Sequence, residues 1–238
     1  MRNRSSKNNL FDTIKKYYNT SYYDIVSLNA VNNHHYRNLA KKIRIKEKQE
    51  ILDIACGTGE WLKECKKRKT QTIGIDISEK AIKVCKILMP DADFCIASAE
   101  ALPFADNFFD IITCFGALEH FLDPVKSLKE MIRVGKKSTH FLFLVPNENF
   151  IAKRLGLFKG TDQINVKEEA RTLKEWECMF ESVDVKIIKK WKDLHILSKS
   201  WIFRKGIQAA PIRFFQSLIV AILPLNWQYQ VYFLCERQ

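Results

Sequence analysis

Short apolar runs alternate with stretches of helical spacing through the middle of the chain. Residues 50–55 form a compact apolar run that ends at a glycine-containing turn, a pattern typical of a buried strand. The stretch 60–69 then carries Trp61, Leu62 and Cys65 at helical spacing. This alternation predicts strands over 50–55, 71–76, 92–97, 109–114 and 139–145, and helices over 60–69, 78–88 and 124–134.

Strands that alternate with helices predict right-handed crossovers and a parallel sheet. The predicted strands are almost continuously apolar, as required when helices cover both faces of a sheet. The expected class is therefore α/β, with a doubly wound sheet.

The pattern is looser on either side of this central part. Beyond Pro146, we expect helices over 147–158 and 172–180, and strands over 183–191 and 229–235. The first 49 residues have a helical pattern, with tyrosines clustered near the start (Tyr17, Tyr18, Tyr22 and Tyr23). We divide the chain into an N-terminal helical cap, a core, and a C-terminal half of the same domain with helical insertions and the final strands: 1–49, 50–147 and 148–238.

The composition predicts a globular cytoplasmic protein. The chain has 238 residues, of which 47% are hydrophobic. No apolar run reaches the roughly 18–20 residues of a membrane-spanning helix, and the N-terminus lacks the apolar core of a secretory signal. The seven cysteines form no C-x-x-C pair, so a disulfide framework or a zinc ribbon is not expected.

The net charge of +12 lies on the flanks of the chain. Residues 1–50 carry +7, residues 51–150 carry −1 and residues 151–238 carry +6. A basic surplus attracts nucleic acid, anionic lipid or acidic substrates, and it also occurs on ordinary lysine-rich surfaces. Charge alone therefore selects no partner.

The sharpest chemical signal is the glycine-rich turn in LDIACGTGEW, residues 52–61. Gly57 and Gly59 let the backbone turn tightly and approach a ligand, and the next helix presents unpaired N–H groups to it. A dinucleotide fingerprint would need another glycine where Glu60 or Leu62 stands, so NAD and FAD are disfavoured. A phosphate-binding GxxxxGK[ST] loop is also missing.

Three weaker signals follow at the ends of later strands. Asp76 ends the second strand, where a carboxylate can accept both hydroxyls of a ribose. Residues 97–100 leave the third strand, and residues 115–124 follow the fourth.

Together, these four segments resemble the motifs of class I S-adenosylmethionine-dependent methyltransferases, in the broad subgroup of small-molecule O- and C-methyltransferases. The resemblance covers residues 50–147. It implies a Rossmann-like, mostly parallel seven-stranded sheet with an antiparallel last strand, and S-adenosyl-L-methionine as cofactor. It also implies the cofactor-binding residues: Asp53, Ala55, Cys56, Gly57 and Gly59; Asp76 and Ile77; Ser98, Ala99 and Glu100; and Cys114.

The sequence departs from the family pattern at two positions. Ala55 stands where the first glycine is usual, and Ser98 stands where an Asp often binds the adenine amino group. Serine can still accept a hydrogen bond. Cofactor binding is therefore expected to survive both changes.

His120, in the stretch that the subgroup writes as LEH, is the candidate general base, because imidazole titrates near neutrality. The alternative is a histidine that only packs or binds backbone. No cluster of Asp, Glu and His at ligand spacing indicates a metal. The clamp of nucleobase amino-methyltransferases and the Pro-Cys loop of C5-cytosine enzymes are both missing, so no clear nucleic-acid motif is present.

The predicted reaction is in-line methyl transfer to a small-molecule acceptor, with a lipid-like molecule as one option. The alternatives are methylation of RNA or protein, and a cofactor-binding subunit without activity. Residues 200–225 join a basic start to a dense apolar end. Such a segment can lie in a membrane headgroup region or pack as an ordinary helix. We therefore expect a small-molecule acceptor as partner, and residues 200–225 leave two alternatives, peripheral membrane contact and an ordinary packed helix.

Overall fold

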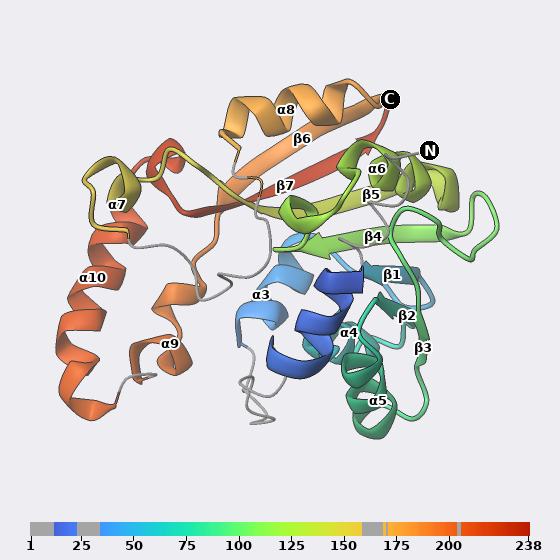
Figure 1. The fold of residues 1–238 in the computed structure, drawn as a ribbon, viewed down its shortest axis with the longest axis horizontal. Coiled ribbons are helices and arrows are strands. Elements are labelled where there is room, and N and C mark those ends of the chain that lie inside the picture. Colours follow the sequence, from blue (N-terminus) through green and yellow to red (C-terminus); the bar gives the residue numbers. More distant parts are fainter. Residues whose placement is uncertain (1–11, 23–33, 159–168, 170, 204–205) are drawn as a thin grey trace.

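The computed structural model describes residues 12–22, 34–158, 169, 171–203 and 206–238 (Figure 1). Seven strands form one sheet in the order β3-β2-β1-β4-β5-β7-β6. The strands are β1 Glu50–Ile54, β2 Gln71–Asp76, β3 Asp93–Ile96, β4 Phe109–Phe115, β5 Gly135–Pro146, β6 Val185–Lys192 and β7 Gln230–Arg237.

Helices connect these strands. The α-helices are α3 His34–Lys42, α4 Glu60–Lys66, α5 Glu79–Leu88, α6 Pro124–Val134, α7 Ile151–Arg154, α8 Leu173–Glu181, α9 Lys199–Phe203 and α10 Ala210–Ile222. A helix over residues 12–17 leads into the π-helix η1 Tyr18–Tyr22. The short 3-10 turns are η2 Leu118–His120, η3 His195–Leu197, η4 Ile207–Ala209 and η5 Leu225–Trp227.

The strand directions confirm the expected fold class. β1 pairs in parallel with β2 and β4, β2 with β3, and β4 with β5. β7 runs antiparallel to both of its neighbours, β5 and β6. The last strand is therefore inserted in reverse between two strands that point the same way as the rest of the sheet.

Two apolar clusters cover the two faces of the sheet. On one face, α6 and α8 pack against the central strands through Leu128, Met131, Trp176 and Phe180. On the other face, the packing comes from α3, α4 and α5. The almost continuously apolar strands follow from this double cover, since each of their faces is buried.

Local signals in the sequence explain where several helices begin. The Ser78 hydroxyl caps α5 by accepting a hydrogen bond from the Ala81 amide at 3.2 Å. Asp123 caps α6 in the same way, with Pro124 in the first turn. Thr172 and Glu175 form a reciprocal capping box at the start of α8.

The predicted helix over residues 147–158 is wrong in extent, because only Ile151–Arg154 is α-helical. The Asn147 side chain donates hydrogen bonds to the carbonyl oxygens of Asn226 and Gln228, which fixes this residue outside any helix. At the other end, Gly156 takes a left-handed φ of 68°. Helical spacing in the sequence indicates neither the hydrogen bonds of Asn147 nor the left-handed backbone of Gly156.

The N-terminal tyrosine cluster is described only in part. Tyr17 and Tyr18 lie in the helical segment before α3, with their ring centroids 5.5 Å apart. Tyr23 lies outside the described residues. The division of the chain at residues 49 and 147 stays a prediction.

The connection between β6 and β7 includes residues 200–225, for which peripheral membrane contact is one of the two predictions. This connection contains α9, η4 and α10, which lie to one side of the sheet in Figure 1. Among the described residues, no helix is both long and apolar enough to span a bilayer.

The indole of Trp176 supports a prediction about stability. Trp176 is fully buried, and its Nε1 donates a hydrogen bond to the Pro146 carbonyl at 2.8 Å. Trp176→Phe should lower the free energy of unfolding by about 2–3 kcal/mol, because it removes volume and leaves a carbonyl without its donor. Urea unfolding measures the change. Trp191→Phe on the half-buried edge strand is the control, and an equal loss in both variants would contradict the assigned role.

Candidate active site

The glycine-rich turn joins β1 to α4 through left-handed backbone. Ala55, Gly57 and Gly59 have φ values of 56°, 55° and 77°. A Cβ atom on Gly59 would lie 2.4 Å from Met89 Cε and 3.1 Å from Cys85 Sγ. Glycine at position 59 is therefore favoured by its left-handed conformation, and a Cβ atom there would also displace the end of the Met89 side chain.

Asp76 connects this turn to the end of β2. Its Oδ2 accepts a hydrogen bond from the Gly57 amide at 3.0 Å, and its Oδ1 accepts one from the Ser78 amide at 2.8 Å. Each carboxylate oxygen can accept more than one hydrogen bond. The residue predicted as a ligand group therefore also holds the loop in place.

Asp53 lies in β1, directly opposite Thr113 of β4. The Thr113 hydroxyl donates a hydrogen bond to Asp53 Oδ1 at 2.6 Å. Burial raises the pKa of the Asp53 carboxyl to about 7, the hydrogen bond from Thr113 opposes this rise, and the charge of Asp76 adds to it. Asp53 is thus poised between its neutral and ionised forms near pH 7.

A cavity of about 330 Å³ opens where β1, β2, β3 and β4 end, at the lower end of the range for ligand sites. Most of the predicted site residues line it. They are Asp53, Ala55, Cys56, Gly57, Asp76, Ile77, Ser98, Ala99, Glu100 and His120. Gly59 and Cys114 are not among the lining residues; Cys114 is fully buried.

The turn after β3 is held by its own polar contacts. Ser98 Oγ accepts a hydrogen bond from the Glu100 amide at 3.2 Å, and Glu100 Oε1 accepts one from the Asp123 amide at 2.9 Å. Glu100 therefore ties this turn to the segment that follows His120.

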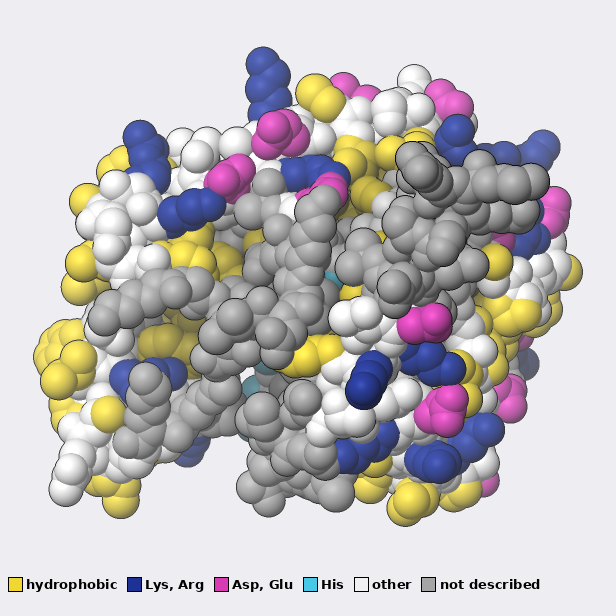
Figure 2. All heavy atoms as spheres, in the orientation of Figure 1, with side chains coloured by type: hydrophobic (Ala, Val, Ile, Leu, Met, Phe, Trp, Pro, Cys, Tyr) yellow, Lys and Arg dark blue, Asp and Glu magenta, His cyan; other side chains and the backbone are white. Residues whose placement is uncertain are grey.

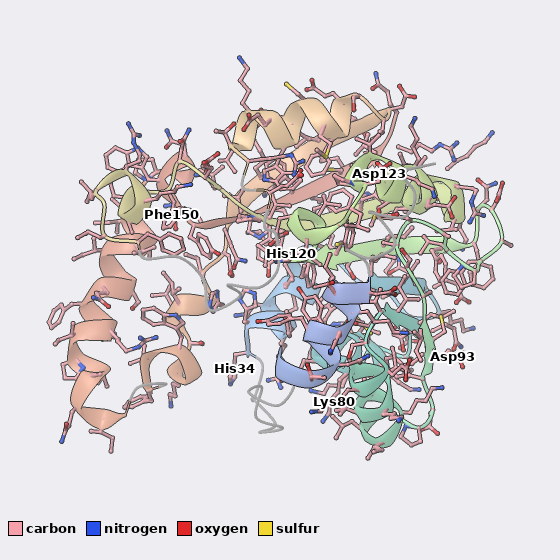
Figure 3. All side chains as sticks on the ribbon, in the orientation of Figure 1. His34, Lys80, Asp93, His120, Asp123 and Phe150 are labelled. Carbon is pink, nitrogen blue, oxygen red and sulfur yellow. The ribbon has the colours of Figure 1, made fainter. Side chains whose placement is uncertain are left out.

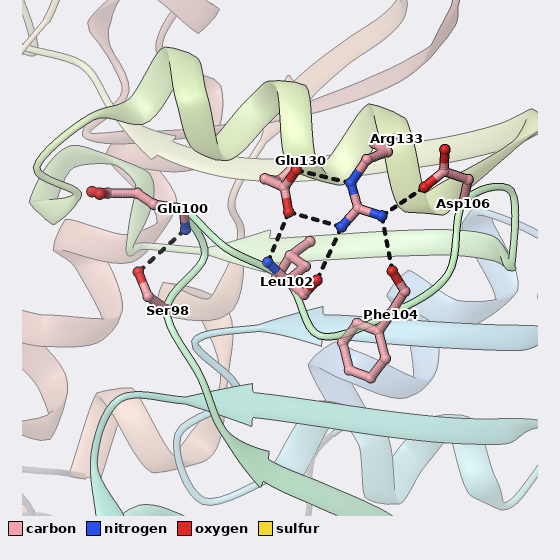
Figure 4. Close-up of polar contacts among 7 residues, drawn as sticks. All are labelled: Ser98, Glu100, Leu102, Phe104, Asp106, Glu130 and Arg133. Carbon is pink, nitrogen blue, oxygen red and sulfur yellow. Dashed lines mark hydrogen bonds and ion pairs between the residues drawn. The ribbon is translucent and has the colours of Figure 1, made fainter.

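Arg133 and Glu130 of α6 fix the chain directly after that turn (Figure 4). Glu130 Oε2 accepts a hydrogen bond from the Leu102 amide, while Arg133 donates to the carbonyl oxygens of Leu102 and Phe104 at 2.9 Å each. Helix α6 thus holds the segment that follows the cavity-lining turn.

His120 ends the η2 turn and lines the cavity. In Figure 3 it lies near the centre of the view, between the end of β4 and the N-terminal helix. Its predicted use as a general base stays a prediction.

Tyr36, Trp61 and Phe115, which are not among the predicted site residues, form an aromatic part of the cavity wall. Tyr36 of α3 stacks on Phe115 at a centroid distance of 6.2 Å, and Trp61 meets Phe115 edge-on at 5.5 Å. Tyr18 lines the same cavity. Trp61 lies beside the glycine-rich turn in the sequence, so its position could have indicated a site residue. The position of Tyr36 at the cavity depends instead on how α3 packs.

The indole of Trp61 is 2% exposed, and its N–H has no hydrogen-bond partner among the residues that the structure describes. An unpaired buried donor is costly.

Comparison with known proteins identifies the family. Residues 52–143 match the family described as methyltransferase domain. The chain is 30% identical to the uncharacterized methyltransferase YcgJ of Bacillus subtilis over 72% of its own length and 71% of that protein. The chain belongs to the class I S-adenosylmethionine-dependent methyltransferases.

Other relatives of this methyltransferase match over shorter stretches. The demethylmenaquinone methyltransferase of Renibacterium salmoninarum is 41% identical, over 37% of each chain. A solved S-adenosylmethionine-dependent methyltransferase from Aquifex aeolicus shares the fold with a TM-score of 0.60 at 15% identity, covering 86% of this chain and 90% of its own. The narrower LEH subgroup stays a prediction.

The residues at the cavity fit S-adenosylmethionine, the cofactor of this methyltransferase. Left-handed backbone leaves room for close approach, and two carboxylates stand at adjacent strand ends on the cavity wall. Among the described residues, no group of acids, histidines and cysteines is arranged to hold a metal ion.

Ala55 should be a point of backbone strain in the methyltransferase. Left-handed backbone costs a residue with a Cβ atom roughly 1–2 kcal/mol. Because glycine also loses more entropy on folding, Ala55→Gly should raise the free energy of unfolding by about 0.5–1 kcal/mol. Thermal and urea unfolding measure this gain. Ala117→Gly, where φ is −136°, is the control; stabilisation by both changes would argue against strain at Ala55.

The raised pKa of Asp53 predicts how stability depends on pH without cofactor. A carboxyl whose folded pKa is raised stabilises the fold fully below its ordinary pKa, and this contribution is lost as pH rises through about 7. Relative to Asp53→Asn, the wild type should therefore lose about 2–4 kcal/mol between about pH 4 and pH 7.5. Urea unfolding across pH tests this, with Asp93→Asn at an exposed position as control. A pH-independent difference would show that Asp53 titrates normally.

Proposed function

We propose that this methyltransferase binds S-adenosylmethionine along the ends of β1, β2 and β3 and methylates a small apolar acceptor. The observation that carries the proposal is the composition of the cavity, which has carboxylates and backbone amides on one side and Tyr18, Tyr36 and Phe115 on another. The polar part suits the cofactor, and the aromatic part suits a ring or an isoprenoid chain.

Specific roles follow for the two carboxylates. Asp76, already fixed by the Gly57 and Ser78 amides, accepts the ribose hydroxyls. Asp53 faces the cationic methionine end, whose charge favours the ionised carboxylate and lowers its raised pKa. The turn Ser98–Glu100 lies against the adenine.

When bound, the cofactor would supply a methyl group on a sulfonium: an acceptor nucleophile would form a bond to the methyl carbon in line with the C–S bond, which would break and leave its electron pair on the departing thioether sulfur. The chain's own contribution is positioning, because oriented reactants gain about 7–11 kcal/mol in favourable cases. Tyr36, Phe115 and Trp61 form the wall against which an acceptor is held. If the acceptor carries a proton, His120 at the cavity edge accepts it.

The acceptor class is supported by the relatives. Those named as demethylmenaquinone and ubiquinone/menaquinone C-methyltransferases are named for quinones, which are apolar rings with lipid tails. This chain spans 37% of the first of these and 55% of the second. An apolar acceptor would partition into lipid, so a cytoplasmic enzyme with peripheral membrane contact through residues 200–225 accompanies the proposal.

Cofactor binding by variants tests the assigned roles. Asp76→Ala should weaken S-adenosylmethionine binding by about 1.5–3 kcal/mol, the range for hydrogen bonds to a charged group. It should weaken binding of methylthioadenosine, which lacks the amino-acid end, to a similar degree. Asp53→Asn should weaken S-adenosylmethionine much more than methylthioadenosine.

Isothermal titration measures both affinities, with Asp93→Ala as the control and thermal unfolding as the check on folding. Normal affinity in folded Asp76→Ala would refute its role. A methyl-transfer screen with quinols, RNA and protein then identifies the acceptor; transfer only to RNA or protein would overturn the acceptor class. Cofactor binding without any transfer would favour a non-catalytic subunit.

A further inference from the structure

Helix α10 has its polarity reversed relative to a normal surface helix. The residues it buries are Ala210 and Ser217, which are small. Its large apolar side chains instead point outward, with exposures of 42–81%. We call this set the α10 outer face: Ile212, Phe214, Phe215, Leu218, Ile219 and Ile222.

The reversal follows from how α10 packs. Arg213 turns inward, where its guanidinium stacks on Trp201 of α9 at 3.7 Å and its Nε donates a hydrogen bond to the Trp201 carbonyl. The Ser217 hydroxyl bonds back to the Phe214 carbonyl within α10. Because Arg213 and Ser217 make their contacts on the inner side of α10, the outer face has no charged residue.

This apolar surface continues on the neighbouring connection. Asn147 and Phe150, at the entrance to α7, bind the segment that leaves α10: Asn147 donates to two carbonyls there, and Phe150 packs on Tyr229 at 4.8 Å. Directly after α7, Leu155 and Leu157 are 63% and 71% exposed. In Figure 2, yellow side chains gather at the left margin, over the place of α10 in Figure 1.

The stretch of chain that contains α9 and α10 has no acidic residue. Residues 194–235 contain no Asp or Glu, although the chain has 27 of them, and the Lys and Arg residues in this stretch include Lys199 and Arg213. Arg154 of α7 adds exposed positive charge, whereas Lys153 is paired with Glu148 at 2.8 Å. An apolar helix whose own stretch of chain carries cations and no acidic residue attracts an anionic lipid surface, whereas a second copy would bring like charges together.

Topology places this surface on the same side as the cavity. α7 follows the carboxyl end of β5, α9 follows that of β6, and α10 leads to the start of β7, which pairs with the end of β5. The cavity opens at the carboxyl ends of β1, β2 and β4. A surface held against lipid here therefore lies at the edge where an acceptor enters.

We propose that the α10 outer face inserts into the headgroup region of an anionic bilayer, with the carboxyl edge of the sheet toward the membrane. The docking itself is independent of the proposed methyl transfer. Its connection to an apolar acceptor rests on that proposed function.

Vesicle flotation of the full chain tests the docking. The wild type should bind phosphatidylcholine vesicles that contain phosphatidylglycerol, bind pure phosphatidylcholine far less, and lose most binding at high salt. The double variant Phe215→Glu, Ile222→Glu should reduce the bound fraction by about tenfold or more, because two charges enter the apolar contact. Ile87→Glu on α5 is the matched control, since Ile87 is 79% exposed and Ile222 is 81% exposed, and it should bind like the wild type.

Circular dichroism and titration with S-adenosylmethionine on the same proteins separate docking from the proposed function. Lost vesicle binding with retained cofactor affinity supports the docking site. Unchanged binding in the double variant, or no preference for anionic lipid, overturns it. The proposal is also overturned if the wild type sediments as a dimer and binds no vesicles while the double variant sediments as a monomer. A second copy would then cover the α10 outer face.

Discussion

The hydrogen bond from the Gly57 amide to the Asp76 carboxylate joins the ends of two neighbouring parallel strands, and the site geometry depends on it. The contact fixes the glycine-rich turn at the end of β1 relative to the end of β2. The turn is left-handed at three positions, so it needs such an external anchor. The anchor is itself a candidate ligand group. Since its hydrogen bond to Gly57 is present without a ligand, the turn has its shape before a ligand binds.

Two carboxylates with different environments share this small region. Asp76 accepts hydrogen bonds from two backbone N–H groups. Asp53 has one hydroxyl partner and is buried in the sheet, so its pKa rises to about 7. A cationic group on the ligand would reverse that cost, which couples ligand binding to the charge of a buried strand residue.

The parts added around the sheet complete the cavity wall and its surroundings. The N-terminal helices contribute Tyr18 and Tyr36, and α6 supports the turn after β3 through Arg133. The C-terminal insertions place an apolar helix with its large side chains outward on the same edge. In the proposed function, the sheet holds the cofactor and these additions select the acceptor.

The central strands, their parallel direction and the glycine-rich turn were predictable. Apolar periodicity and turn residues such as Gly57 indicate local structure over a few residues, and the alternation of strands with helices indicates parallel pairing. Ser78 as a helix cap was predictable for the same reason. The sequence could not show that 147–158 is mostly non-helical, since Asn147 binds carbonyls near residue 226. Nor could it show the strain at Ala55, the stacking of Tyr36 on Phe115, or the outward apolar face of α10. Each of these depends on contacts between residues far apart in the chain, which only the tertiary structure determines.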